Sequence, residues 1–184
     1  MKILLTNSTC IQDIHGGAPR AVDEIANYFS KKGDDVSVLV PDRLSKGTGI
    51  DTIKPNYRII RYFYFRGFFK PLNIFTAFFF YYKYFKNVDF DIIWGNSPEP
   101  WIFIPKIAKK IIYTVHGPWM LESELDFNLN YVKKIFIKFL YKKIVKKNSI
   151  IHFESNYTLK QCSKETSAFV NSKVIISPIL IDEN

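Results

Sequence analysis

The segment best suited to chemistry pairs two glycines with charged neighbours, and it reads Asp13-Ile-His-Gly-Gly-Ala-Pro-Arg20. Gly16 and Gly17 let backbone amides approach a ligand closely. A helix that begins at Ala18 would point its positive end at the same place, which favours an anion such as phosphate. Arg20 adds a fixed charge in the first turn. We predict a phosphate-binding segment; a loop that needs glycine only for its shape is the alternative.

A second segment, Thr114-Val-His-Gly-Pro-Trp119, places a histidine directly after an apolar run. His116 can donate a hydrogen bond or a proton to a sugar hydroxyl or a phosphate oxygen. Trp119 could stack on a sugar ring, and Glu122 with the acids that follow it could orient acceptor hydroxyls. The structural alternatives are a half-buried histidine bonded to the backbone, a tryptophan that caps the core and a solvated acidic turn.

A third segment, Asn96-Ser-Pro-Glu-Pro100, holds Glu99 between two prolines on a stiff turn. Glu99 is therefore a further candidate for binding an acceptor. The alternative is a simple helix start, since proline is favoured in a first helical turn.

Basic side chains form the fourth feature. A lysine ridge recurs every four residues in one predicted helix, and it comprises Lys134, Lys138, Lys142 and Lys146. The stretch from Arg58 to Asn87 mixes arginine and lysine with dense aromatic residues and contains no acid. Both patterns suit the surface of an anionic membrane. Nucleic acid is the competing partner, and a solvated lysine face over a phenylalanine-rich core is the structural alternative.

The composition limits the possible classes of protein. The chain has 184 residues, a formal net charge of +9 and 47% hydrophobic residues, so it can bury a core and attracts phosphate. Cys10 and Cys162 stand alone, which argues against a disulfide framework and a zinc site. We expect no metal and no cofactor. The apolar start is too short for a signal peptide, and the region from Tyr62 to Phe85 is interrupted by charge, so we expect no membrane span.

Short apolar runs alternate with helical stretches. The predicted strands are Ile3–Leu5, Val36–Val40, Arg58–Tyr64, Asp91–Trp94, Ile111–Val115, Ile150–Phe153 and Lys173–Ile176. The predicted helices are Ala18–Lys32, Pro71–Lys86, Trp101–Lys110, Tyr131–Lys147 and Ser155–Thr166, and Asp42–Asn56 is predicted to be a loop. This alternation predicts an α/β fold, a Rossmann-like doubly wound sheet of mainly parallel strands in three α/β/α layers. Such sheets bind ligands at the carboxyl ends of their strands. We therefore expect functional residues in the segments that follow strands, namely Asn7–Gly17, Pro41 onward, Gly95–Pro100, His116–Glu124 and Glu154–Tyr157.

The order of these motifs resembles that of retaining GT-B glycosyltransferases of family 4. The resemblance rests on Met-Lys-Ile-Leu-Leu, Gly-Gly-Ala-Pro-Arg, Asp-Ile-Ile-Trp-Gly-Asn-Ser-Pro-Glu-Pro, Tyr-Thr-Val-His-Gly-Pro-Trp, His-Phe-Glu-Ser-Asn-Tyr-Thr and a closing Ile-Leu-Ile-Asp. It implies transfer of a hexose from a nucleotide-sugar donor with retention of configuration. It places Gly16 and Gly17 by the donor diphosphate and His116 by the transferred sugar and leaving phosphate. It also implies that the first domain shapes the acceptor site and binds membrane through a basic helix.

Members of that family carry a second, similar domain with most nucleotide contacts. We expect residues 1–177 to form the amino-terminal domain and 178–184 to begin the linker to that missing partner domain, so that the chain alone transfers no sugar. The predicted function is synthesis of a polysaccharide or lipid-linked saccharide in the cytoplasm, on the inner face of the cell membrane.

Three other functions stay open at this point. The chain could be a non-catalytic membrane- or partner-binding subunit of a split glycosyltransferase. A dinucleotide-dependent oxidoreductase would use Asp42 for a ribose, although the third glycine of the fingerprint is missing. Nucleic-acid binding, which we do not expect, would show salt-sensitive retention of oligonucleotides.

Overall fold

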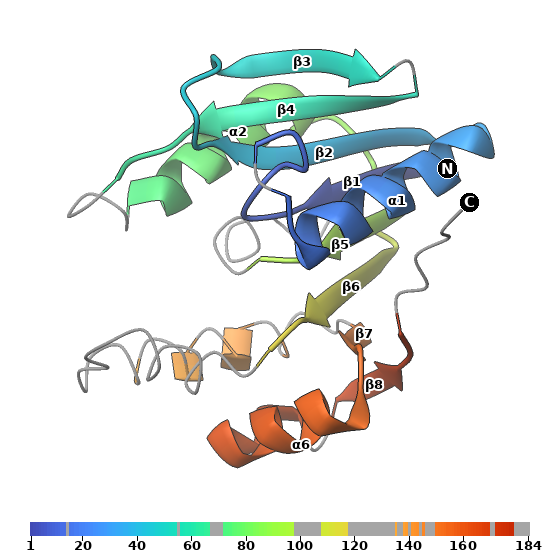
Figure 1. Cartoon of the computed structure of the whole chain (residues 1–184), viewed down its shortest axis with the longest axis vertical. Coiled ribbons are helices and arrows are strands. Elements are labelled where there is room, and N and C mark those ends of the chain that lie inside the picture. The colour runs from blue at the N-terminus through green and yellow to red at the C-terminus, as the bar shows by residue number, and fades with distance from the viewer. Residues whose placement is uncertain are drawn as a thin grey trace. The chain divides into compact units, whose positions relative to one another are not determined.

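Figure 1 shows the computed structural model of the chain. The structure describes residues 1–13, 15–54, 56–66, 72–97, 108–117, 135, 138–139, 141–143, 145, 150–169 and 172–178. The chain divides into two compact units, a first unit that contains Met1–Lys110 and a second unit of Ile111–Leu180. Each unit is described by itself.

The first unit is built on a mostly parallel sheet with the strand order β3-β4-β2-β1-β5. Its strands are β1 (Lys2–Thr6), β2 (Asp35–Asp42), β3 (Gly49–Lys54), β4 (Tyr57–Phe63) and β5 (Ile92–Gly95). All neighbouring pairs are parallel except β3 with β4, which is antiparallel. The inner strands are buried nearly throughout, which explains why they are continuous apolar runs in the sequence.

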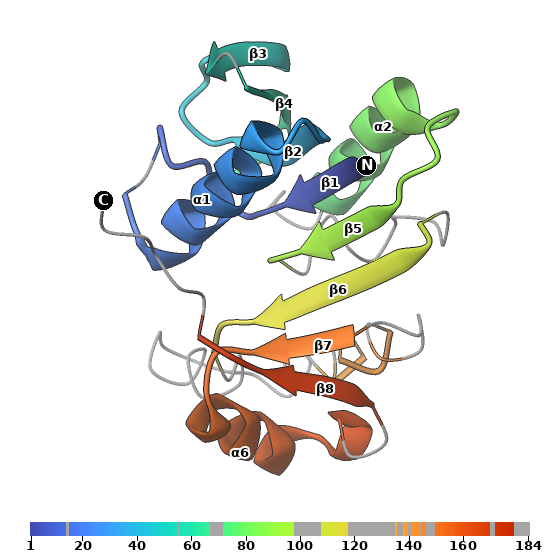
Figure 2. The same ribbon diagram turned by 90° about the vertical axis from the view of Figure 1, so that its right-hand side faces the viewer.

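Two helices cover opposite faces of this sheet, as Figure 2 shows: α1 (Gly17–Lys31), which packs against β2, and α2 (Asn73–Phe85), which packs against β4. The chain crosses from β1 to β2 in one direction and, through α2, from β4 to β5 in the other. Because parallel crossovers are right-handed, this reversal puts the two helices on opposite faces. The direction of the strand order therefore reverses between β1 and β5. The carboxyl ends of these two strands form the topological switch point, where such sheets bind ligands.

The second unit carries three parallel strands, β6 (Lys110–Val115, whose first residue falls in the first unit), β7 (Ile150–Phe153) and β8 (Lys173–Ile176). Two helical segments follow β7, namely α6 (Asn156–Glu165) and η2 (Ser167–Phe169). Phe169 packs edge-on against Phe153 and Tyr141, and all three are buried. The described residues of the predicted helix 131–147 are helical.

Two predicted elements need correction. The segment Asp42–Asn56, predicted as a loop, contains β3; an edge strand paired on one side needs little apolar patterning, and Ile50 is exposed. The predicted helix Trp101–Lys110 lies largely outside the described residues, but its end is wrong because Lys110 begins β6. The α/β class with mainly parallel strands is confirmed. The division at residue 177 stays a prediction.

Within the described part of the chain, no helix has the length and apolarity needed to cross a bilayer.

Candidate functional site

The amino terminus of α1 is an uncapped helix end. Gly16 is its N-cap residue, with extended backbone and no side-chain hydrogen bond to the first turn. The contrast is α6, where the Ser155 hydroxyl accepts a hydrogen bond from the Thr158 amide at 3.1 Å. Uncapped first-turn amides carry the positive end of the helix dipole, so this end of α1 can hold an anion.

Neither glycine at this helix end is required by backbone geometry, since neither has a positive φ. A Cβ atom on Gly17 would meet no atom within 4 Å, and one on Gly16 would meet only Pro19 Cδ, at 3.8 Å. Both residues are exposed. The fold therefore leaves open space beside them, as a phosphate-binding segment requires.

Arg20 lies in the first turn of α1, as predicted, but it is already paired. Its Nε donates to Glu24 Oε1 at 3.0 Å on the same helix, and its side chain is half exposed. An anion at the helix end would therefore compete with Glu24 for this guanidinium.

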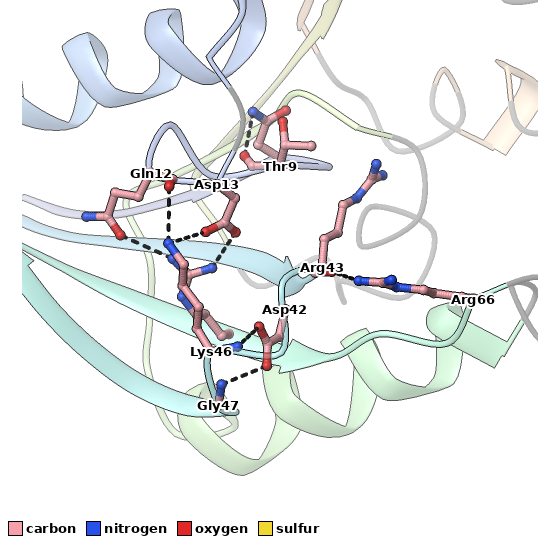
Figure 3. A network of polar contacts seen from close by, with 10 residues as sticks. Thr9, Gln12, Asp13, Asp42, Arg43, Lys46, Gly47 and Arg66 are labelled. Carbon is pink, nitrogen blue, oxygen red and sulfur yellow. Dashed lines mark hydrogen bonds and ion pairs between the residues drawn. The ribbon is translucent and has the colours of Figure 1, made fainter.

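A buried charge network holds the loop that joins β1 to α1. Arg61, on β4, donates to Asp13 Oδ2 at 2.5 Å and to Gln12 Oε1 at 3.1 Å, and the side chains of Arg61 and Asp13 are both fully buried. Lys46 reaches the same carboxylate at 3.1 Å and the Gln12 carbonyl at 3.1 Å (Figure 3). Removal of one member of a buried ion pair leaves an uncompensated charge, so this network fixes the approach to Gly16.

Asp42, the acid that a dinucleotide site would use, is occupied by its own loop. Its two carboxylate oxygens accept hydrogen bonds from the Lys46 and Gly47 amides at 2.8 and 2.9 Å (Figure 3). It lines one side of an open hollow of about 530 Å³ at the ends of β2 and β4. Because both oxygens accept from amides of the same loop, Asp42 holds this turn, and each oxygen retains acceptor capacity for a further donor.

The switch point of the first unit carries buried polar groups without partners. Thr6 and Asn96 are joined through the backbone, since the Asn96 amide donates to the Thr6 carbonyl at 2.9 Å. Among the described residues, the buried atoms there that lack a hydrogen-bond partner are Thr6 Oγ1, Asn7 Oδ1, both amide atoms of Asn96 and Ser97 Oγ. Each such atom costs about 1–3 kcal/mol. A hydroxyl-rich ligand that supplied partners would recover this cost.

Asn7, Asn96 and Ser97 lie in two of the segments that the sequence predicts to carry functional residues, Asn7–Gly17 and Gly95–Pro100, whereas Thr6 was not selected. The available signal was position, because polar residues directly follow the apolar runs of β1 and β5.

In the second unit, His116 follows β6 and Glu154 follows β7, so the parallel pairing brings the two side chains together. His116 Nδ1 lies 2.8 Å from Glu154 Oε1, and the two side chains are 23% and 35% exposed. The hydrogen bond from His116 is the main cause that lowers the pKa of Glu154. His116 Nε2 is buried and, within the described residues, has no hydrogen-bond partner. The pair thus leaves one ring nitrogen for a ligand.

The remaining predicted site residues divide into two groups. Lys138 and Lys142 are helical and exposed. The others lie outside the described residues, namely Glu99, Trp119, Glu122, Lys134 and Lys146. Within the described part of the chain, His, Cys, Asp and Glu form no group of three or more that could hold a metal ion.

Helix α2 exposes an unusual surface, which we call the aromatic face. Its large exposed apolar residues are Leu72 (the N-cap residue), Phe75, Phe78, Phe79 and Tyr82. The ammonium groups of Lys83 and Lys86 make cation–π contacts with the rings of Tyr84 and Tyr82, at 5.2 and 5.4 Å from the ring centroids. The same mixture recurs in the described helical residues of 135–145, where exposed Ile135 and Phe139 lie among exposed lysines.

The sequence model of Glycosyltransferase Family 4 matches residues 15–168 of the chain. No curated protein matches the sequence.

Three solved structures that share the fold belong to longer chains. Sucrose-phosphate synthase from Thermosynechococcus elongatus aligns with a TM-score of 0.74 and 11% identity, over 96% of this chain and 47% of that one. An alpha-glucosyltransferase, solved with UDP and a 13-mer DNA containing an HMU base, gives 0.56 and 15%, over 99% and 43%. An E. coli protein described as trehalose-6-phosphate bound with UDP-2-fluoro glucose gives 0.56 and 10%, over 99% and 49%. The chain thus spans less than half of each and has the fold of one Rossmann-like GT-B half.

Proposed function

Because the chain belongs to glycosyltransferase family 4, we propose that it is the acceptor-side half of a nucleotide-sugar-dependent hexosyltransferase that retains anomeric configuration. The observation that carries this proposal is the family match over residues 15–168, which includes both Gly16–Gly17 and His116. The uncapped start of α1 and the open ring nitrogen of His116 support it, since both provide unsatisfied groups of the kind that a phosphate and a sugar would bind.

In the proposed mechanism the amides at the start of α1 hold the donor diphosphate. Negative charge grows on that diphosphate as the sugar leaves, and fixed dipoles that point at growing charge lower the barrier without reorganisation. The buried Arg61–Asp13 pair keeps the loop in place for this role. His116 contacts a hydroxyl of the transferred sugar, and the unpartnered groups of Thr6, Asn96 and Ser97 take acceptor hydroxyls. None of these contacts needs a metal, so we expect EDTA to leave turnover unchanged.

We propose that a second α/β domain supplies the remaining nucleotide contacts and closes over the donor. The purified 184-residue chain should then release no sugar from a nucleotide-sugar donor. The direct check is to read the coding sequence beyond Asn184 and to assay the chain with and without any domain found there. Donor turnover by the 184-residue chain alone would contradict the proposal.

The donor is best probed first with UDP-glucose, because two proteins of the same fold were solved with UDP or a UDP-sugar analogue. Isothermal titration calorimetry of the protein with UDP-glucose, GDP-glucose and NAD in turn compares two donor classes and tests the oxidoreductase alternative. Binding of NAD in preference to every nucleotide sugar would contradict the proposal.

We further propose that the enzyme works at an anionic membrane and makes a polysaccharide or lipid-linked saccharide. The exposed aromatic face of α2 and the exposed Lys138 and Lys142 support this location, since aromatic and basic side chains together favour the bilayer interface. The chain should float with anionic vesicles and not with neutral ones.

The matched variants for flotation carry the same charge change at different places. The double variant Lys138→Glu with Lys142→Glu should release the protein from the vesicles. The control variant Lys31→Glu with Lys173→Glu, on α1 and β8, should not. Equal flotation of both variants would remove the lysine ridge from the proposal. Salt-sensitive retention of oligonucleotides in place of vesicles would favour nucleic acid.

A further inference from the structure

The second unit contains two histidines, His116 and His152, whose environments differ at every ring nitrogen. His152 lies on β7 and is 6% exposed. Its Nε2 lies 2.8 Å from the Ser177 carbonyl oxygen, and its Nδ1 lies 3.2 Å from the Thr114 hydroxyl. A carbonyl oxygen can only accept, so Nε2 of a neutral His152 must carry the proton, and the hydroxyl of Thr114 then donates to Nδ1.

His116 has the opposite arrangement. Its Nδ1 faces the carboxylate of Glu154 at 2.8 Å, and that hydrogen bond lowers the pKa of the glutamate, which is therefore ionised at neutral pH. An ionised carboxylate can only accept hydrogen bonds, so the proton of a neutral imidazole must be on Nδ1. Nε2 is then a bare acceptor, and it is the atom that is buried without a partner among the described residues.

We infer that Glu154 is a positioning residue that fixes the His116 proton on Nδ1, so that Nε2 recognises a hydroxyl of the ligand as a hydrogen-bond acceptor. The inference rests on the proposed function for the identity of the ligand, which would be a sugar. This tautomer restricts the ligand groups that His116 can bind, because an unprotonated Nε2 repels the oxygens of an ionised phosphate and accepts a hydrogen bond only from a donor. The contact therefore selects a sugar hydroxyl over the diphosphate.

The test is nitrogen NMR of the 184-residue chain labelled with ¹⁵N-histidine at alkaline pH, because the shifts of the two ring nitrogens distinguish the two neutral tautomers from each other and from the imidazolium. The chain has three histidines, and His116→Gln identifies the signals of His116. In the unaltered chain we expect the proton of His116 on Nδ1 and the proton of His152 on Nε2. A His116 ring protonated on Nε2 would overturn the inference, and this measurement needs no variant of Glu154.

Glu154→Leu removes the carboxylate and leaves Nδ1–H without this acceptor, whereas the amide oxygen of a glutamine could still accept from it. We expect Glu154→Leu to shift the His116 proton to Nε2, in whole or in part, and to leave His152 unchanged. Glu165→Leu is the matched control, because Glu165 is a carboxylate of the same unit that accepts from the Tyr141 hydroxyl at 2.8 Å. An unchanged His116 spectrum in a folded Glu154→Leu variant would also overturn the inference. Neither result depends on turnover, so this inference can fail while sugar transfer stands, and sugar transfer can fail while the tautomer stands.

Discussion

The loop before α1 and the pair at the ends of β6 and β7 are both held by a carboxylate, but they treat their charges differently. In the loop, Asp13 and Arg61 are fully buried against each other, with Lys46 as a second cation. In the pair, His116 and Glu154 are partly exposed, and one histidine nitrogen has no partner in the described part of the chain. In the first arrangement buried opposite charges neutralise each other, whereas in the second a ring nitrogen beside a partly exposed pair is left for a ligand. Substitutions should therefore reduce stability in the first region and ligand recognition in the second.

The largest effect on stability is expected for Arg61→Leu. It strands the buried Asp13 carboxylate, and loss of one member of a buried pair costs about 3–5 kcal/mol. Arg58→Leu is the matched control on the same strand, since Arg58 pairs with Asp35 at 2.7 Å with both side chains about half exposed. Such surface pairs contribute about 0–1 kcal/mol. Urea unfolding of both variants measures the difference, and equal losses would mean that the loop network does not depend on burial.

The largest effect on function is expected for His116→Ala in the enzyme that contains both domains. Loss of one hydrogen bond to the sugar should reduce kcat/KM about 10–100-fold, which corresponds to roughly 1.4–2.7 kcal/mol, with little change in unfolding free energy. His152→Ala should behave in the opposite way, because His152 is bonded at both nitrogens and buried. Unchanged kinetics in His116→Ala would remove this residue from the site.

A smaller effect is expected at the start of α1. Gly17→Ala should leave the melting temperature unchanged, because a Cβ atom there meets nothing within 4 Å, and should weaken UDP-glucose binding about tenfold by filling the ligand's space. Gly33→Ala is the control, since Gly33 has a φ of +85° that disfavours alanine. It should lower stability and leave binding intact. A Gly17→Ala variant that binds the donor normally would show that the diphosphate lies elsewhere.

The smallest effect concerns acid stability. A carboxyl group whose pKa is lowered in the folded state contributes stability above its unfolded pKa and loses it as pH falls through the lowered folded value. The unaltered chain should therefore exceed Glu154→Gln in unfolding free energy at pH 7, and the difference should disappear well below pH 4.5, the ordinary pKa of a glutamate. Urea unfolding at several pH values measures this, and a difference that persists at low pH would mean that the charge of Glu154 does not matter.

The sequence predicted the regular elements better than the partners of the site residues. Apolar runs and helical spacing located seven of the eight strands in the described part of the chain, because strands buried on both faces and amphipathic helices leave strong patterns. The edge strand β3 was missed because it is paired on one side only and Ile50 on it is exposed.

For the site, the sequence selected Gly16, Gly17 and His116, and it placed Asp13 and Glu154 in segments expected to carry function, but it did not predict which residues pair with them. Arg61 lies 48 residues from Asp13, and Glu154 lies 38 residues from His116. These partners meet only through strand pairing, which no local pattern encodes. In sequence, Arg61 was one of several basic residues among aromatics, and Glu154 opened a segment expected to carry function but had no assigned role.

The central claim is that the uncapped start of α1 binds a nucleotide sugar. Titration of the ¹⁵N-labelled 184-residue chain with UDP-glucose, followed at the Gly17 amide, tests it directly. We predict that the Gly17 signal shifts along a saturable binding curve. A Gly17 amide signal that does not move on addition of UDP-glucose would contradict the claim.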